Sequence, residues 1–195
     1  MYSHFVDVGR LEMICGPMFS GKSEELIRRL KRTILAGMPT IIFTPNIDNR
    51  YAEDHICSHD GKKLEAISIS HIEEILDYVQ DDTTVIGIDE VQFLDGEIVS
   101  VIMKLVNSGK RVVCAGLDKD FKAESFGQMP ELLALADDVT KLTAICMCCG
   151  RPANFTQRLI AGKPASYNDP LILIGASESY EARCRLCYQI DRNDI

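Results

Sequence analysis

The sequence predicts an α/β fold, in which helices cover both faces of a parallel sheet, followed by a small cysteine-rich domain. Two observations support this prediction. Up to residue 145, short runs that are apolar throughout alternate with segments of helical periodicity, which is typical of strands buried on both faces. From residue 146 onward, polar residues and glycine prevail, and five of the eight cysteines lie there. We therefore predict two domains, residues 1–145 and 146–195.

Residues 10–15 are predicted to form the first strand, and a glycine-rich turn connects it to a helix over 23–36. The helix is amphipathic, and one face carries Leu26, Ile27, Leu30 and Ile34. Gly37 favours a helix end and Pro39 prevents continuation. The basic residues of this helix are expected to form a solvated face; they are Arg28, Arg29, Lys31 and Arg32.

The later elements of the first domain follow the same alternation. Residues 46–63 are polar and rich in turn residues, which indicates a loop or a hairpin. The remaining predicted strands are 40–44, 84–89, 111–116 and 138–145, and the remaining predicted helices are 72–79, 97–106 and 131–136.

Composition excludes several classes of protein. The chain has 195 residues, of which 46% are hydrophobic and 26% charged, as expected for a globular rather than a disordered chain. Apolar runs such as Val85–Ile88 are far shorter than the roughly 20 residues of a membrane span, and the N-terminus lacks the pattern of a secretory signal. A net charge of -8 disfavours extended contact with nucleic acid. We therefore expect a cytoplasmic protein with neither a membrane nor a nucleic acid as partner.

The first chemical motif is Gly16-Pro17-Met18-Phe19-Ser20-Gly21-Lys22-Ser23. It fits the phosphate-loop pattern G-x-x-x-x-G-K-[ST] and lies between a predicted strand and a predicted helix, the context that this motif requires. The backbone amides of such a loop cradle phosphate oxygens, and the helix N-terminus adds positive potential. Lys22 supplies a cation for the terminal phosphates, and the Ser23 hydroxyl can bind Mg²⁺. The alternative is a fortuitous glycine turn.

The second motif is the apolar strand over 84–89 that ends in Asp89-Glu90. In a protein with a phosphate loop, a carboxylate at such a strand end is the usual residue near Mg²⁺. We expect Asp89 to act there through water. Glu90 could accept the proton of an acceptor hydroxyl in a kinase or orient water in an ATPase. The alternative is a solvated acidic turn.

The third constellation pairs Cys146-x-x-Cys149 with Cys184-x-x-Cys187. Four thiolates can hold one Zn²⁺ tetrahedrally, and a site with no open coordination position is structural. Cys148 is then a fifth thiol that the site does not need. A redox pair or buried free thiols are the alternatives.

These motifs by themselves leave three functions open: a kinase, a phosphate-loop ATPase whose zinc ribbon holds single-stranded nucleic acid, and a nucleotide sensor without catalysis. The second would need basic and aromatic residues on one face, but the chain has no tryptophan and is acidic. The intact pair Lys22 and Glu90 argues against the third.

The order of motifs resembles that of the cellular-type, or type II, thymidine kinase family over nearly the whole chain. In the first domain the resemblance rests on 16–23, 48–51, 89–93, 117–121 and 125–127. In the tail it rests on 146–149, 155–159, 175–180 and 184–188. The combination of the phosphate loop with the cysteine tail is more specific than any one of these segments.

The resemblance implies a RecA-like phosphate-loop fold and transfer of the γ-phosphate of ATP to the 5′-hydroxyl of thymidine. Glu90 matches the general base of the family, and the other implied nucleotide-site residues are Gly16–Ser23, Asp48, Asn49, Arg50, Asp89 and Gln92. Arg50 would stabilise charge during transfer. The implied nucleoside-site residues are Met18, Phe121, Thr156, Leu171, Ile172, Leu173, Ile174, Gly175 and Tyr180, several of them in a lasso loop between the cysteine pairs. The resemblance also implies Mg²⁺, structural Zn²⁺, a homotetramer and feedback inhibition by thymidine triphosphate.

Overall fold

The computed structural model describes residues 8–46, 55–57, 63–171 and 178–192. Seven of the predicted site residues lie outside these ranges: Asp48, Asn49, Arg50, Ile172, Leu173, Ile174 and Gly175. Within the described ranges, no helix is both long enough and apolar enough to cross a membrane.

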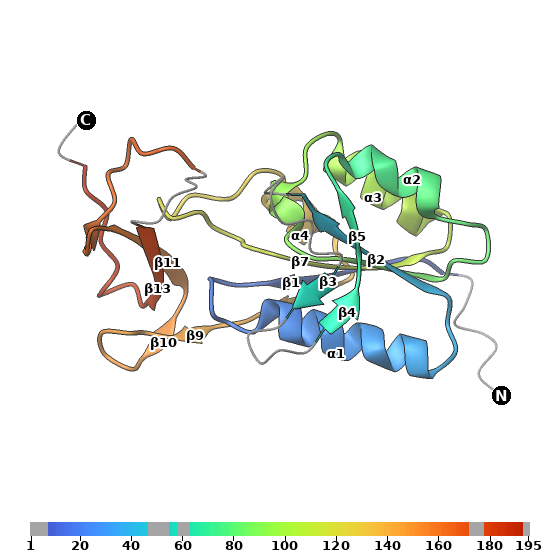
Figure 1. The fold of residues 1–195 in the computed structure, drawn as a ribbon, viewed down its shortest axis with the longest axis horizontal. Helices are drawn as coiled ribbons and strands as arrows, with labels where there is room; N and C mark the ends of the chain where they lie inside the picture. The colour runs from blue at the N-terminus through green and yellow to red at the C-terminus, as the bar shows by residue number, and fades with distance from the viewer. Residues whose placement is uncertain (1–7, 47–54, 58–62, 172–177, 193–195) are drawn as a thin grey trace.

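The main body of the molecule is a six-stranded sheet in which all neighbouring strands are parallel (Figure 1). Its strands are β1 (Arg10–Cys15), β2 (Thr40–Pro45), β5 (Ile67–Ile69), β6 (Val85–Ile88), β7 (Arg111–Gly116) and β8 (Asp138–Lys141). Their order is β5-β2-β6-β7-β1-β8. Cys15 of β1 is level with Gly116 of β7, and Ile88 of β6 is level with Cys114. The carboxyl ends of β1 and β6 therefore lie on either side of β7 at one edge.

Helices cover both faces of this sheet, as predicted. Helix α1 (Lys22–Leu35) lies on one face, and α3 (Ile98–Asn107), α2 (Ile75–Tyr78) and α4 (Met129–Leu135) lie on the other (Figure 1). Strand β1 separates two apolar cores because successive side chains of a strand point to opposite faces. Ile14 packs with the buried face of α1, whereas Leu11 and Met13 pack with α3 and α4.

Glu12 interrupts this apolar pattern on the α1 side of the sheet. It is only 3% exposed and contacts the guanidinium groups of Arg29 at 2.7 Å and Arg111 at 2.8 Å. Arg29 also contacts Glu25 and Asp138, and its side chain is only 13% exposed. The expectation that the whole basic cluster of α1 is solvated was therefore wrong for Arg29.

Several boundaries differ from the predicted ones. The region 46–63 contributes β3 (His55–Cys57), which pairs with β4 (Lys63–Glu65) as an antiparallel hairpin, one of the two predicted possibilities. The predicted strand over 138–145 is divided into β8 and β9 (Ala144–Ile145), and the predicted helix over 72–79 begins as a 3-10 turn at Ile72–Glu74. Strand β5 was not predicted, because three residues give too short a pattern.

The C-terminal part is antiparallel and lies beyond the carboxyl ends of the main strands (Figure 1). Strand β11 (Phe155–Ile160) pairs with β12 (Lys163–Pro164) and with β13 (Glu178–Arg183), and β9 pairs with β10 (Pro152–Ala153). Its buried apolar cluster is small and consists of Ala144, Cys146, Ala153, Ala182 and Cys184.

Candidate active site

The phosphate loop leads from β1 into α1, and its shape depends on two glycines. Gly16 has a φ of 150°, and a Cβ atom there would lie 2.5 Å from the carbonyl oxygen of Leu142. Gly21 has a φ of 82° and caps the N-terminus of α1. Lys22 is buried, and its Nζ donates a hydrogen bond to the carbonyl oxygen of Pro17 at 3.0 Å. The lysine charge therefore already points into the loop, where phosphates bind in such motifs.

Asp89 stands at the carboxyl end of β6, facing the start of α1. It is 4% exposed and accepts the backbone N–H of Glu90 at 3.0 Å, and the Ser23 side chain lies close enough to favour its ionised form. Burial and the charge of Glu90 raise the pKa of Asp89 to about 7, although Ser23 and Lys22 oppose the shift. A hydroxyl and a carboxylate beside a phosphate loop are oxygen ligands of the kind that Mg²⁺ prefers.

Glu90 follows directly and has an unusual backbone conformation, with φ 46° and ψ 40°. Its carboxylate accepts a hydrogen bond from Nε2 of Gln92 at 2.6 Å. Oε1 of Gln92 accepts the backbone N–H of Leu117 at 3.0 Å, so the orientation of the amide is fixed. Gln92 was predicted among the nucleotide-site residues, but the structure places its side chain on Glu90 and β7 rather than in the phosphate loop. These two hydrogen bonds can hold the Glu90 carboxylate in one orientation.

Two pockets meet at Glu90. A small pocket of about 100 Å³ adjoins the phosphate loop and is lined by Met18, Phe19, Gly21, Lys22, Ser23, Glu24 and Glu90. A larger pocket of about 280 Å³ lies between the sheet and the C-terminal part, and is lined by Met18, Glu90, Phe93, Leu117, Asp120, Phe121, Phe126, Thr156, Arg158, Leu171 and Tyr180. Among the described residues, Met18 and Glu90 are the two that line both pockets, so Glu90 stands where the contents of the two pockets would meet.

The larger pocket brings together the described residues that the family resemblance implied for the nucleoside. All five of them line it: Met18, Phe121, Thr156, Leu171 and Tyr180. The backbone N–H of Met18 donates to the Thr156 hydroxyl at 3.0 Å, which ties the phosphate loop to β11. Sequence reasoning missed further lining residues, namely Phe93, Leu117, Asp120, Phe126 and Arg158. Phe93 and Phe126, which are in edge contact, lie in or beside segments that carry the resemblance.

Arg158 is the least expected of the missed residues. It is 2% exposed, and its guanidinium lies 3.8 Å from the centre of the Phe121 ring. A buried arginine in a short strand has no signature in hydropathy, because arginines are mostly exposed.

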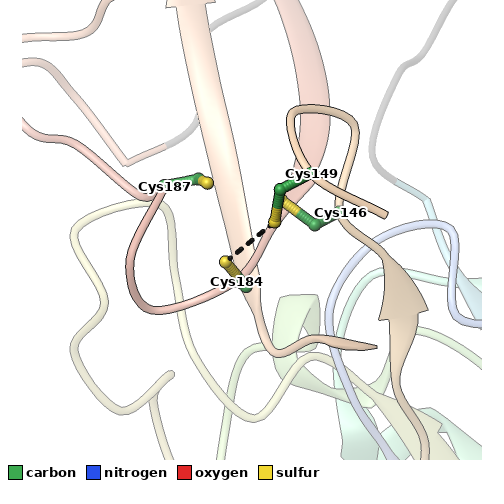
Figure 2. Close-up of side chains that lie close together, drawn as sticks. All are labelled: Cys146, Cys149, Cys184 and Cys187. Carbon is green, nitrogen blue, oxygen red and sulfur yellow. Dashed lines mark hydrogen bonds between the residues drawn. The ribbon is translucent and has the colours of Figure 1, made fainter. Parts of the chain in front are cut away.

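The four cysteines predicted to bind zinc lie together (Figure 2). Their Sγ atoms are all within 4.8 Å of one another, and those of Cys149 and Cys184 are 3.6 Å apart. Tetrahedral zinc with bonds near 2.3 Å places sulfur atoms about 3.8 Å apart, so the cluster fits the ion. Cys148 stands outside the cluster and contacts the guanidinium of Arg183. Burial disfavours the Cys146 thiolate, but the backbone N–H groups around it prevail and lower its pKa to about 6.

Comparison with known families agrees with this geometry. The family model described as thymidine kinase matches residues 9–188, which include the phosphate loop, both pockets and all four clustered cysteines. Members of the family are kinases that phosphorylate nucleosides with ATP. Since the match covers nearly the whole chain, the chain belongs to the thymidine kinase family.

Proposed function

We propose that this enzyme transfers the γ-phosphate of ATP to the 5′-hydroxyl of thymidine, forming thymidine monophosphate for DNA synthesis by salvage. The observation that supports this most is the position of Glu90 in the lining of both pockets. A kinase needs a base within reach of the acceptor hydroxyl and close to the transferred phosphate. Glu90 meets both requirements if ATP occupies the smaller pocket and thymidine the larger one.

On the donor side, we propose that the amides of 16–23 and the Lys22 ammonium hold the phosphates. The Ser23 hydroxyl, with Asp89 behind it, would hold Mg²⁺, which offsets charge that develops on the phosphate oxygens. Asp48, Asn49 and Arg50 join this site through the family resemblance alone. Phosphoryl transfer needs positioning and charge stabilisation more than covalent chemistry, and these residues supply both.

On the acceptor side, the pocket suits a small, uncharged and partly aromatic molecule. Three phenylalanines, Phe93, Phe121 and Phe126, line it, and its volume of about 280 Å³ is close to the lower end for small-molecule sites. That size favours one nucleoside over an oligonucleotide. We place Met18 and Thr156 near the thymine methyl group, and Leu171–Gly175 and Tyr180 around the base, as in the family.

We propose that zinc, bound by the cysteine cluster, stabilises the acceptor side of the site. Cys184 directly follows β13, which carries Tyr180 of the larger pocket, and the backbone N–H of Met147, between the cysteines of the first pair, donates to the carbonyl oxygen of Ala182 in the same strand. We therefore propose a catalytic α/β domain over 1–145 and a zinc domain over 146–195 that completes the nucleoside site. A homotetramer, inhibition by thymidine triphosphate and a cytoplasmic location are proposed from the resemblance.

Replacement of the base tests the proposal. Glu90→Gln keeps the shape of the side chain and its contact with Gln92 but removes the basic carboxylate. Loss of a general base typically lowers turnover by roughly 10²–10⁴-fold, so kcat should fall in that range while the KM for ATP changes little. The measurement is steady-state transfer of radiolabelled phosphate from ATP to a panel of nucleosides, with thymidine expected as the best acceptor.

The matched control is Glu131→Gln, which removes a carboxylate from an exposed position on α4, away from both pockets. Its kcat should equal that of the wild type. A Glu90→Gln enzyme within about threefold of wild-type kcat would remove Glu90 from the role of base. Hydrolysis of ATP by the wild type, without transfer to any nucleoside, would instead favour an ATPase.

A further inference from the structure

We propose that Arg158 is the positioning residue of the nucleoside pocket, holding the wall of the α/β domain and the wall of the zinc domain in one arrangement. This inference rests on the proposed function and adds to it a residue that sequence reasoning missed. Arg158 stands on β11 opposite Tyr180 of β13, and both residues line the larger pocket.

Each nitrogen atom of the Arg158 guanidinium makes a hydrogen bond, and together these bonds reach two segments beside this pocket. Nε donates to the Tyr180 hydroxyl at 3.0 Å. Nη1 donates to the carbonyl oxygen of Pro170 at 2.6 Å, and Nη2 donates to that of Leu171. One side chain therefore fixes the aromatic ring of β13 and the backbone that leads out of the described region at residue 171.

The same group also reaches the α/β domain. Its Cζ atom lies 3.8 Å from the centre of the ring of Phe121, a residue of the loop that follows β7. The carbonyl oxygen of Phe121 accepts a hydrogen bond from the Tyr188 hydroxyl at 2.6 Å, so a second contact from the zinc domain holds this loop. The Arg158 guanidinium is thus the point at which Phe121, Tyr180 and Leu171 are held together.

Arginine is required here by its shape. Its planar guanidinium presents donors in a fixed fork and stacks on an aromatic ring, whereas the ammonium of lysine is a compact charge with no plane. A lysine at 158 could keep the positive charge and one or two of these hydrogen bonds. It could not stack on Phe121 while also reaching two carbonyl groups and a hydroxyl.

The decisive variant is therefore Arg158→Lys, assayed as the full-length enzyme with ATP and thymidine. If Arg158 positions the pocket, the KM for thymidine should rise by at least about tenfold, the effect of losing one hydrogen bond made by a charged group. The KM for ATP should stay within twofold of the wild type, and so should kcat at saturating thymidine, because the hydrogen bonds described for Arg158 go to Tyr180, Pro170 and Leu171, which lie outside the phosphate loop. Zinc content and thermal unfolding confirm that the variant is folded.

Arg192→Lys is the matched control, since Arg192 also belongs to the C-terminal part and lies 5.0 Å from an aromatic ring, that of Tyr167, but it is exposed. Its KM for thymidine should not change. A second variant, Tyr180→Phe, removes only the hydroxyl that accepts from Nε. Its increase in KM should not add to that of Arg158→Lys in the double variant, because both changes break the same contact.

Three results would overturn the inference. The first is an unchanged KM for thymidine in Arg158→Lys, and the second is a fall in kcat with both KM values unchanged. The third is an equal loss of affinity for ATP and for thymidine together with lowered stability, which would mean that Arg158 has a structural role only. If Arg158→Lys does not fold, an unchanged KM for thymidine in Tyr180→Phe overturns it. A wild-type enzyme that does not phosphorylate thymidine would refute the proposed function instead, before any variant is compared.

Discussion

The α/β domain and the C-terminal part are stabilised in different ways. The sheet lies between two apolar cores that contain most of the buried aliphatic side chains of α1, α3 and the strands. As far as the structure describes it, the buried apolar cluster of the C-terminal part is made of alanines and cysteines. Small domains with so little apolar burial usually need disulfides or a metal, and here four thiols are gathered at one point.

This difference divides the active site. The described residues that line the phosphate-loop pocket all belong to the α/β domain, whereas the larger pocket takes Thr156, Arg158, Leu171 and Tyr180 from the C-terminal part. Zinc should therefore support nucleoside binding but contribute little to ATP binding. Substitutions in one domain, with ligand binding measured at both pockets, test this division.

The largest effect is expected from removal of one zinc ligand. In Cys184→Ser the site keeps three thiolates, and structural zinc can supply about 10 kcal/mol or more of folding free energy in small metal domains. The affinity for thymidine should fall by about 100-fold or more, while that for ATP stays within about threefold. Elemental analysis should give one zinc per wild-type chain and clearly less in the variant, and calorimetry gives both affinities.

Cys148→Ser is the control for this experiment, because Cys148 lies within the same turn but outside the cluster. It should keep both its zinc and its thymidine affinity. Full zinc retention in Cys184→Ser, or zinc loss in Cys148→Ser, would mean that the four ligands are wrongly chosen.

A somewhat smaller effect, this time in the α/β domain, is expected from Leu30→Ala in α1. Leu30 is fully buried, and a Cβ atom at Gly87 of β6 would lie only 2.4 Å from its Cδ1, so the helix packs directly on the sheet. Loss of such a side chain should lower the free energy of unfolding by about 3 kcal/mol, measured by urea denaturation. Zinc content should be unchanged. The exposed Leu35 of the same helix offers the control Leu35→Ala, with an expected change below about 0.5 kcal/mol. Equal destabilisation by both variants would contradict the packing argument.

The smallest of the three effects is expected at Glu12, and it depends on pH. Burial opposes ionisation of Glu12, but hydrogen bonds and charge from Arg111 and Arg29 prevail and hold the pKa of its carboxyl below the usual value. A lowered folded-state pKa stabilises the fold above the unfolded pKa of about 4.3, and this stabilisation is lost as pH falls through the folded value. Glu12→Gln should thus lower the free energy of unfolding by about 2 kcal/mol at pH 7, between the values for surface and buried ion pairs.

The difference between Glu12→Gln and the wild type should begin to shrink below about pH 4.3, where the unfolded chain takes up a proton first, and should vanish once the pH has fallen through the lowered folded-state pKa. Urea denaturation at several pH values measures it. A difference that is the same at pH 7 and at pH 3.5 would show that the ion pairs do not carry it.

The two domains also differ in how far the sequence predicts them. The phosphate loop and Asp89-Glu90 were predicted because each is local: a short motif at the end of an apolar strand. The cluster of four cysteines was predicted because their spacing is itself a signal. Strand β11 was not predicted, because three of its buried residues, Thr156, Gln157 and Arg158, are polar. Their burial depends on partners far along the chain, such as Tyr180 and Gln189, which periodicity cannot reveal. Arg29 was misjudged for the same reason, since Glu12 and Asp138 are distant in sequence.

The left-handed backbone of Glu90 has a consequence for how the enzyme can evolve. For a residue with a Cβ atom, this conformation costs about 1 kcal/mol or more, and glycine or asparagine would adopt it more readily. Folding alone would therefore favour replacing the residue that we propose as the base. An inactive descendant, freed from selection for catalysis, would gain backbone stability by losing Glu90. With Glu90 as the proposed base, the demands of catalysis and of backbone stability oppose each other at one residue.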